Sequence, residues 1–229
     1  MSDILTAANL CKVYGQREPK VHALTDVDLT IQKDSFTAIV GRSGSGKTTL
    51  LNILGGLETP TSGVVQFGNT DIYSLTDSER AAFRRKHIGY VFQFFNLIPE
   101  LSVYDNICLP TYLDHADPDA SFLEEIMDRL GLISKKGKYP AELSGGEQQR
   151  VAVARALSRK PDIILADEPT GNLDRKTGDE LMQVLLLSQR YFNQTILLVT
   201  HDLELAHTAQ RIITLEDGRI CSDLHGGRT

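Results

Sequence analysis

The chain has 229 residues, and its 24 lysines and arginines against 30 aspartates and glutamates give a formal net charge of −6. Hydrophobic residues make up 41% of the sequence and charged residues 24%, a balance that excludes collagen-like, disordered and small disulfide-stapled proteins. The acidic excess argues against a dedicated nucleic-acid-binding protein, so we predict no nucleic-acid partner.

Targeting and redox signals point to a reduced, cytosolic protein. No run in the sequence approaches the ~20 apolar residues that a membrane span needs, and the first five residues lack the basic start and apolar core of a secretion signal. Cys11, Cys108 and Cys221 form no close pair. Neither a disulfide framework nor a zinc site fits that spacing.

Strands are predicted from two apolar patterns. Segment 27–31 alternates apolar and polar residues, as a half-buried strand does, and 36–40 is an apolar run typical of a strand buried on both faces. Shorter apolar segments predict strands at 64–67, 88–92, 163–166 and 196–199. An Asp-Gly pair at 217–218 indicates a hairpin.

Helices are predicted from their start and stop signals. Ser/Thr-x-x-Glu pairs at 76–79 and 121–124 have the capping-box spacing, and the second helix is expected to end at Leu130. The other predicted helices follow the glycine-rich turn 41–46 and cover 144–160 and 181–187. Strands that alternate with helices predict an α/β fold with a mostly parallel sheet. We predict one domain over 1–229 with a helical subdomain inserted at about 94–160.

Segment 41–48, Gly-Arg-Ser-Gly-Ser-Gly-Lys-Thr, fits the phosphate-loop pattern G-x-x-x-x-G-K-[ST]. Its glycines let backbone N–H groups point at phosphate oxygens, and the following helix adds its positive end. Lys47 can reach the β- and γ-phosphates, and the Thr48 hydroxyl can bind Mg²⁺. The alternative is an ordinary glycine-rich turn, but the flanking strand and helix favour ATP or GTP binding. The predicted nucleotide-binding residues here are Gly41, Arg42, Ser43, Gly44, Ser45, Gly46, Lys47, Thr48 and Thr49.

Two carboxylates, Asp167 and Glu168, follow the strand 163–166. Phosphoryl transfer needs one group to hold Mg²⁺ and another to orient the attacking water, and we assign these roles to Asp167 and Glu168 respectively. Acidic residues at a strand end usually begin a solvated loop, but the phosphate loop favours the functional interpretation here.

Segment 143–150, Leu-Ser-Gly-Gly-Glu-Gln-Gln-Arg, indicates a helix start in which Ser144 and Glu147 have capping-box spacing. A plain helix cap is the alternative. Gly145 and Gly146 would also let a phosphate approach the backbone at the positive helix end.

Together these motifs resemble the ATP-binding cassette family. Segment 143–150 is similar to the family's signature motif, and the resemblance covers essentially the whole chain. The stretches 92–99 and 168–174 look like the branch that contains the lipoprotein-releasing, macrolide-efflux and antimicrobial-peptide-resistance ATPases of bacteria. The resemblance implies a P-loop NTPase core with an N-terminal antiparallel β region and a helical subdomain.

The resemblance also implies roles for single residues. Tyr14 matches the aromatic residue that stacks on adenine, although a core position is the alternative. Gln93 matches the glutamine that contacts Mg²⁺, and His201 the histidine that contacts the γ-phosphate and orients water with Glu168. Asp174 matches the aspartate that meets the opposite subunit's phosphate loop. The implied catalytic residues are Glu168, His201, Gln93 and Lys47, and the implied metal ligands are Thr48, Gln93 and Asp167.

Members of this family pair head to tail, so the resemblance implies a homodimer, or a dimer with a related ATPase, that encloses two ATP with Mg²⁺. The phosphate loop of one subunit then faces Ser144, Gly145, Gly146 and Glu147 of the other. A chain without a membrane span must dock on a separate integral membrane permease, at the cytoplasmic face of the membrane. The run 94–98 could form that dock or the core of the helical subdomain, and both remain open.

Three other functions are weighed. Soluble cassette ATPases of translation usually carry two cassettes, and those of DNA repair insert coiled coils or zinc modules, whereas this chain has one phosphate loop and neither insertion. A non-hydrolysing scaffold is disfavoured because Glu168, Gln93 and His201 are retained. A GTPase is disfavoured because no N-K-x-D motif is present. The sequence does not identify the cargo.

Overall fold

The computed structural model describes residues 2–15, 17 and 19–226. The chain forms two compact units, one made of residues 1–81 and 195–229 and the other of residues 82–194. The second unit is therefore inserted between two segments of the first. Within the described residues, no helix combines the length and the hydrophobicity that crossing a membrane requires. The prediction of one domain with an insertion at about 94–160 stays a prediction.

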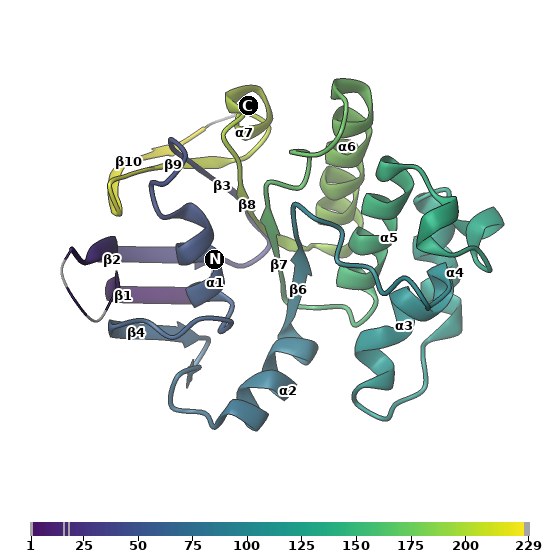
Figure 1. The fold of residues 1–229 in the computed structure, drawn as a ribbon, viewed down its shortest axis with the longest axis horizontal. Helices are drawn as coiled ribbons and strands as arrows, with labels where there is room; N and C mark the ends of the chain where they lie inside the picture. The colour runs from purple at the N-terminus through teal and green to yellow at the C-terminus, as the bar shows by residue number, and fades with distance from the viewer. Residues whose placement is uncertain (1, 16, 18, 227–229) are drawn as a thin grey trace. The chain divides into compact units, whose positions relative to one another are not determined.

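The first unit begins with an antiparallel sheet, as the resemblance implied (Figure 1). Its strands, in the order in which they pair, are β2 (Val21–Gln32), β1 (Asp3–Tyr14), β4 (Ser62–Phe67) and β5 (Thr70–Asp71). In β2, buried apolar residues alternate with more exposed polar ones from Val27 to Ile31, because one face of the sheet is covered. Strand β1 was not predicted, since shifts in its register interrupt the alternation.

A second group of strands in this unit carries the segment 36–40 at its centre. Its strands, in the order in which they pair, are β10 (Arg219–His225), β9 (Arg211–Glu216), β3 (Phe36–Val40) and β8 (Thr195–Val199). Strand β3 runs parallel to both neighbours and is buried throughout, as its apolar run predicted. Strands β9 and β10 form the expected hairpin, and Asp217 and Gly218 both have positive φ. Helix α1 (Lys47–Leu54) follows β3, and α7 (Leu203–Ala206) follows β8.

The second unit contains a parallel strand pair and most of the helices. Strand β6 (Ile88–Val91) pairs with β7 (Ile163–Asp167). Its helices are α3 (Val103–Tyr112), α4 (Ala120–Arg129), the 3-10 turns η1 (Ile133–Lys135) and η2 (Pro140–Glu142), α5 (Gly145–Leu157) and α6 (Arg175–Phe192). Helices α3 and α4 both pack on α5 (Figure 1). Helix α2 (Asp77–His87) leads the chain into this unit.

The helix starts were predicted unevenly. The capping box at 76–79 is confirmed, because the Glu79 carboxylate accepts from the Thr76 N–H at 2.9 Å. The box predicted at Ser121 and Glu124 is wrong. Asp119 caps α4 instead, accepting from the Phe122 N–H at 3.2 Å, and Ser121 only donates its hydroxyl to that carboxylate. Asp119 is preferred as the cap because its carboxylate also pairs with the Lys160 ammonium at 2.9 Å, and Lys160 lies in a distant part of the sequence.

Helix ends and one whole helix differ from expectation. Helix α5 stops at Leu157 rather than at residue 160, and Lys160 has a positive φ of 50° that ends the turn. Helix α6 extends well beyond the predicted 181–187, because Asp174 caps it. Helix α3 was missed because Pro110 lies inside it, and an interior proline normally argues against a helix.

Candidate nucleotide site

The predicted phosphate loop connects β3 to α1 and needs glycine for two reasons, its backbone conformation and its close packing. Gly44 and Gly46 have φ of 80° and 100°, a region that residues with side chains rarely adopt. A Cβ on Gly46 would lie less than 3.0 Å from the Ala23 carbonyl oxygen, and one on Gly41 would lie equally close to the Leu215 carbonyl oxygen. The loop is therefore packed against the main chain of β2 and β9, and Gly46 begins α1.

The loop surrounds the ammonium group of Lys47. This side chain is only 7% exposed, and its Nζ donates to the carbonyl oxygens of Gly41 and Arg42 at 2.9 Å each. The loop is tied to the β9–β10 hairpin because the Gly218 N–H donates to the Ser45 carbonyl at 3.1 Å. The Ser45 hydroxyl is buried and has no hydrogen-bond partner among the described residues. A cation, a helix N-terminus and an unsatisfied hydroxyl thus converge in one loop, which suits a phosphate chain.

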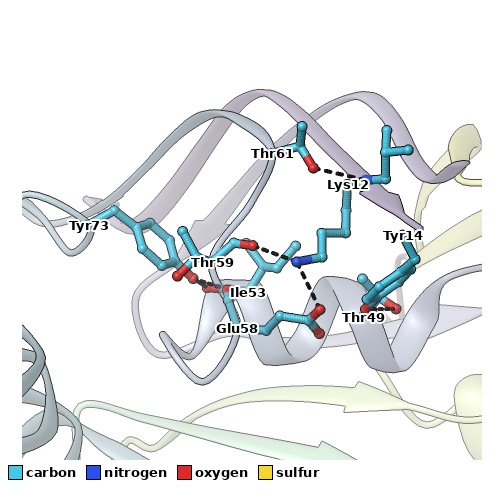
Figure 2. Close-up of polar contacts among 9 residues, drawn as sticks. Lys12, Tyr14, Thr49, Ile53, Glu58, Thr59, Thr61 and Tyr73 are labelled. Carbon is cyan, nitrogen blue, oxygen red and sulfur yellow. Dashed lines mark hydrogen bonds and ion pairs between the residues drawn. The ribbon is translucent and has the colours of Figure 1, made fainter. Parts of the chain in front are cut away.

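Tyr14 lies beside this loop at the end of β1 (Figure 2). Its hydroxyl is 3.3 Å from the Thr49 hydroxyl in α1, and its side chain is 37% exposed. Lys12 places its ammonium 5.0 Å from the centre of the Tyr14 ring. Burial, followed by the neighbouring Glu58 carboxylate, raises the pKa of Tyr14. An exposed ring next to the phosphate loop fits base stacking better than the alternative core position.

Lys12 and Glu58 were not singled out from the sequence. The Lys12 ammonium binds the Glu58 carboxylate at 3.0 Å and the Thr59 carbonyl at 2.8 Å, as Figure 2 shows. The period-2 geometry of a strand places Lys12 on the same face as Tyr14, and that signal could have identified it. Glu58 could not have been found, because it follows α1 and meets the strand only in the folded chain.

His201 follows β8, at the same edge of the strand group as the phosphate loop. Strands β3 and β8 run parallel with Ile39 opposite Val199, and the Thr200 N–H continues the pairing by donating to the Ile39 carbonyl at 3.1 Å. His201 is exposed at this edge. In the first unit the fold thus brings His201, the phosphate loop and Tyr14 to neighbouring ends of strands.

The second unit brings Gln93 together with the two predicted acids. Because Val91 pairs with Ala166 in parallel strands, Gln93 and Asp167 follow at the same strand edge. Glu168 has a positive φ of 45°, which is uncommon for a residue with a side chain and needs support from surrounding contacts. The Asn172 side chain donates to the Gln93 carbonyl at 2.9 Å, so the chain after Glu168 holds Gln93.

Ser144 caps α5 through the predicted box. The Glu147 carboxylate accepts from the Ser144 N–H at 2.8 Å, while the Ser144 hydroxyl accepts from the Glu147 N–H at 3.3 Å. The bond from the Ser144 N–H, followed by the ion pair with Lys135 at 3.0 Å, lowers the pKa of Glu147 to about 2. Glu147 thus orients Ser144, and its negative charge is already paired with the Ser144 N–H and the Lys135 ammonium.

Gly146 and Asp174 bring the starts of α5 and α6 together. A Cβ on Gly146 would lie less than 3.0 Å from the Thr177 methyl group, so this glycine serves helix packing. Gly145 is exposed. Asp174 caps α6 by accepting from the Thr177 N–H at 3.1 Å and from its hydroxyl at 2.6 Å, bonds that lower the pKa of Asp174. Two exposed helix N-termini, at Ser144 and Asp174, therefore lie next to each other.

Comparison with known families identifies the family of this chain. Residues 24–171, more than half of the chain, match the ABC transporter family. This chain belongs to the ABC transporter family. As an ABC ATPase it hydrolyses ATP, and the predicted recognition, fold class and enzymatic activity are all confirmed.

The relatives of this ABC ATPase agree with the predicted branch. It is 44% identical to the lipoprotein-releasing system ATP-binding protein LolD of Geobacter metallireducens, over 97% of this chain and 100% of that protein. It is 43% identical to the macrolide export ATP-binding/permease protein MacB of Bradyrhizobium diazoefficiens, over 96% of this chain but 34% of that protein. A solved dimer of the ATP-binding cassette MJ0796, in a post-hydrolysis state with ADP and Pi, is 40% identical with a TM-score of 0.88, covering 96% of this chain and 98% of that one.

Proposed function

We propose that two copies of this ABC ATPase enclose two ATP molecules and that hydrolysis drives a separate membrane permease. The observation that carries the dimer is the pair of exposed helix N-termini at Ser144 and Asp174. The positive helix end at Ser144 suits a phosphate of ATP, and Asp174, beside it, matches the aspartate that meets the opposite subunit's phosphate loop. In a head-to-tail pair, the phosphate loop of the second copy would meet them. The dimeric MJ0796 cassette supports this arrangement.

In this proposal the chain's own residues divide the work at each ATP. The phosphate loop and Lys47 bind the phosphates, and Tyr14 stacks on the base. Closure of the dimer adds Ser144 to the γ-phosphate and excludes water, which strengthens each electrostatic contact. ATP therefore favours the closed pair because it makes contacts there that the open state lacks.

Magnesium fits the residues assigned to it. A hydroxyl of Thr48, an amide of Gln93 and a carboxylate of Asp167 are oxygen donors, which Mg²⁺ prefers. When bound, the ion would neutralise charge that develops on the phosphates. Glu168 would orient the attacking water, and His201 would contact the γ-phosphate.

Replacing Glu168 by Gln tests this function directly. We expect E168Q to bind ATP as the unmodified protein does, to lose hydrolysis, and to accumulate as an ATP-dependent dimer in size-exclusion chromatography with light scattering. E124Q, which changes an exposed glutamate of α4, is the matched control and should hydrolyse ATP normally. A variant E168Q that hydrolyses ATP at the normal rate, or stays monomeric with ATP and Mg²⁺, would refute the proposed mechanism.

The permease and the place at the cytoplasmic face of the membrane belong to the same proposal. MacB supports it, because its name joins ATP binding to a permease and this chain matches only 34% of its length. Phe94 is 69% exposed and Ile98 37% exposed, which favours docking over core packing for these two residues of the run 94–98. The permease determines which cargo is moved. It also determines whether ATP hydrolysis powers export, extraction or mechanical transmission.

The permease contact can be tested by crosslinking. With a photoreactive residue at position 94, we expect membranes of the source cell to yield one integral membrane protein as the main product. F94S should lose co-purification of that protein while keeping the ATPase rate of the isolated subunit. A product that is ribosomal or DNA-bound would instead favour the soluble cassette functions.

A further inference from the structure

Gln149 on α5 has a fully buried side chain that contacts the main chain on two sides. It is 0% exposed, and its Nε2 donates to the Phe92 carbonyl at 3.2 Å and to the Pro169 carbonyl at 2.9 Å. The first carbonyl directly precedes Gln93, and the second directly follows Glu168. One amide thus joins the chain segments that carry two of the assigned hydrolysis residues.

Further contacts hold the same segments. The Asn172 side chain donates to the Gln93 carbonyl at 2.9 Å, so residues 92 and 93 are held from both sides. The Gly171 N–H donates to the Glu168 carbonyl at 3.0 Å, closing the turn in which Glu168 has positive φ. A conformation of this kind persists only where surrounding contacts determine it strongly.

The chemistry of Gln149 argues against a role in stability alone. Its Oε1 is buried and accepts no hydrogen bond from the described residues. A half-satisfied buried amide is less favourable than an apolar side chain of the same shape, which would fill the same space without an unpaired oxygen. The amide is therefore explained by the two carbonyl groups that it holds.

We propose that Gln149 is a positioning residue for ATP hydrolysis. Its two hydrogen bonds set the distance between the segment that carries Gln93 and the segment that carries Glu168. Gln149 belongs to the same helix, α5, that Ser144 caps. A contact made at Ser144 would therefore reach both hydrolysis residues through one rigid helix. This inference rests on the proposed function, because it takes the roles of Gln93 and Glu168 from it.

The test compares Q149M with Q148M. Methionine keeps the length of glutamine and removes both donors. Gln148 lies one position earlier on the same helix, where its Nε2 donates to the Leu143 carbonyl at 3.3 Å. We expect Q149M to lower kcat about 10- to 100-fold, as misplacement of catalytic groups does. Its ATP dissociation constant should stay within about twofold, because the phosphate loop is untouched. Q148M should keep both values.

Every outcome decides the question. Normal kcat in a folded Q149M overturns the proposal, and so does an equal loss in Q148M, since that indicates a general effect on α5. If circular dichroism shows that Q149M does not fold, Q149L, another apolar side chain of similar volume, takes its place, and a normal kcat in that variant overturns the proposal. E168Q is measured alongside: if E168Q remains active, the proposed function has failed, whereas an inactive E168Q with an active Q149M refutes only the role of Gln149.

Discussion

The Cα of Gly146, in the first turn of α5, lies against the methyl group of Thr177, in the first turn of α6, with no room for a Cβ between them. The residues that cap these helices, Ser144 and Asp174, are each a few positions away. The contact therefore sets the spacing of the two helix N-termini that we assign to the partner's nucleotide site.

Replacing Gly146 by Ala is expected to destabilise the protein by about 1–3 kcal/mol, as overpacking does in a close contact. It should also weaken the ATP-dependent dimer of E168Q. The matched control for stability is G145A, whose added Cβ would find Phe95 at an ordinary 3.6 Å, so its free energy of unfolding should stay nearly unchanged. T177S removes the methyl group and should restore G146A in urea unfolding, because serine keeps the hydroxyl that bonds Asp174. Equal stability of G146A and the unmodified protein would show that the helices do not meet this closely.

Replacing Gly46 by Ala is expected to abolish ATP binding. The new Cβ would collide with the Ala23 carbonyl, and φ of 100° is unfavourable for alanine. G44A is the control, because Gly44 has φ of 80° but nothing within 4 Å of its Cβ position. It should bear only the backbone strain, about 1–2 kcal/mol. Isothermal titration with ATP separates the two, and equal affinities would contradict the packing argument.

Replacing Tyr14 by Ala should weaken ATP binding about 2- to 12-fold, which corresponds to the ~0.5–1.5 kcal/mol of an aromatic pair beyond its buried area. Y14F keeps the ring and loses the contacts that the hydroxyl makes with Thr49 and Glu58, so it should bind ATP nearly normally. Fluorescence titration with a labelled ATP analogue gives both constants. Should Y14F and Y14A lose affinity equally, the hydroxyl contact matters and the stacking role is wrong.

The stability of the protein should fall on acidification partly through Glu147. Its pKa is lowered from 4.5 to about 2 in the folded chain, so its contribution is present above pH 4.5 and is lost as the pH falls toward 2. K135M removes the ion pair, raises the pKa of Glu147 and should move the acid-unfolding midpoint to higher pH. The same substitution at Lys33, an exposed lysine of the first unit, is the control. Identical midpoints for K135M and K33M would mean that the ion pair does not contribute.

Much of the site could be predicted because its signals are local. The phosphate loop needs glycine at particular φ values, Ser144 and Glu147 satisfy each other three residues apart, and the buried run 163–166 announces the strand end at Asp167. Each depends on a few consecutive residues, so one sequence contains the whole pattern.

The sequence by itself therefore determined the α/β alternation, the phosphate loop and the acids at the end of β7. Together these features also indicated the family of the chain. Only the tertiary structure decided that Asp119 rather than Ser121 caps α4, that Gly146 is a packing residue, and that Gln149 holds two distant carbonyl groups. The physical reason is that each of these residues meets a group far along the chain: Asp119 pairs with Lys160, Gly146 lies against Thr177, and Gln149 bonds the Phe92 carbonyl. Their hydrogen bonds and contacts exist only after the elements have packed, so no local spacing records them.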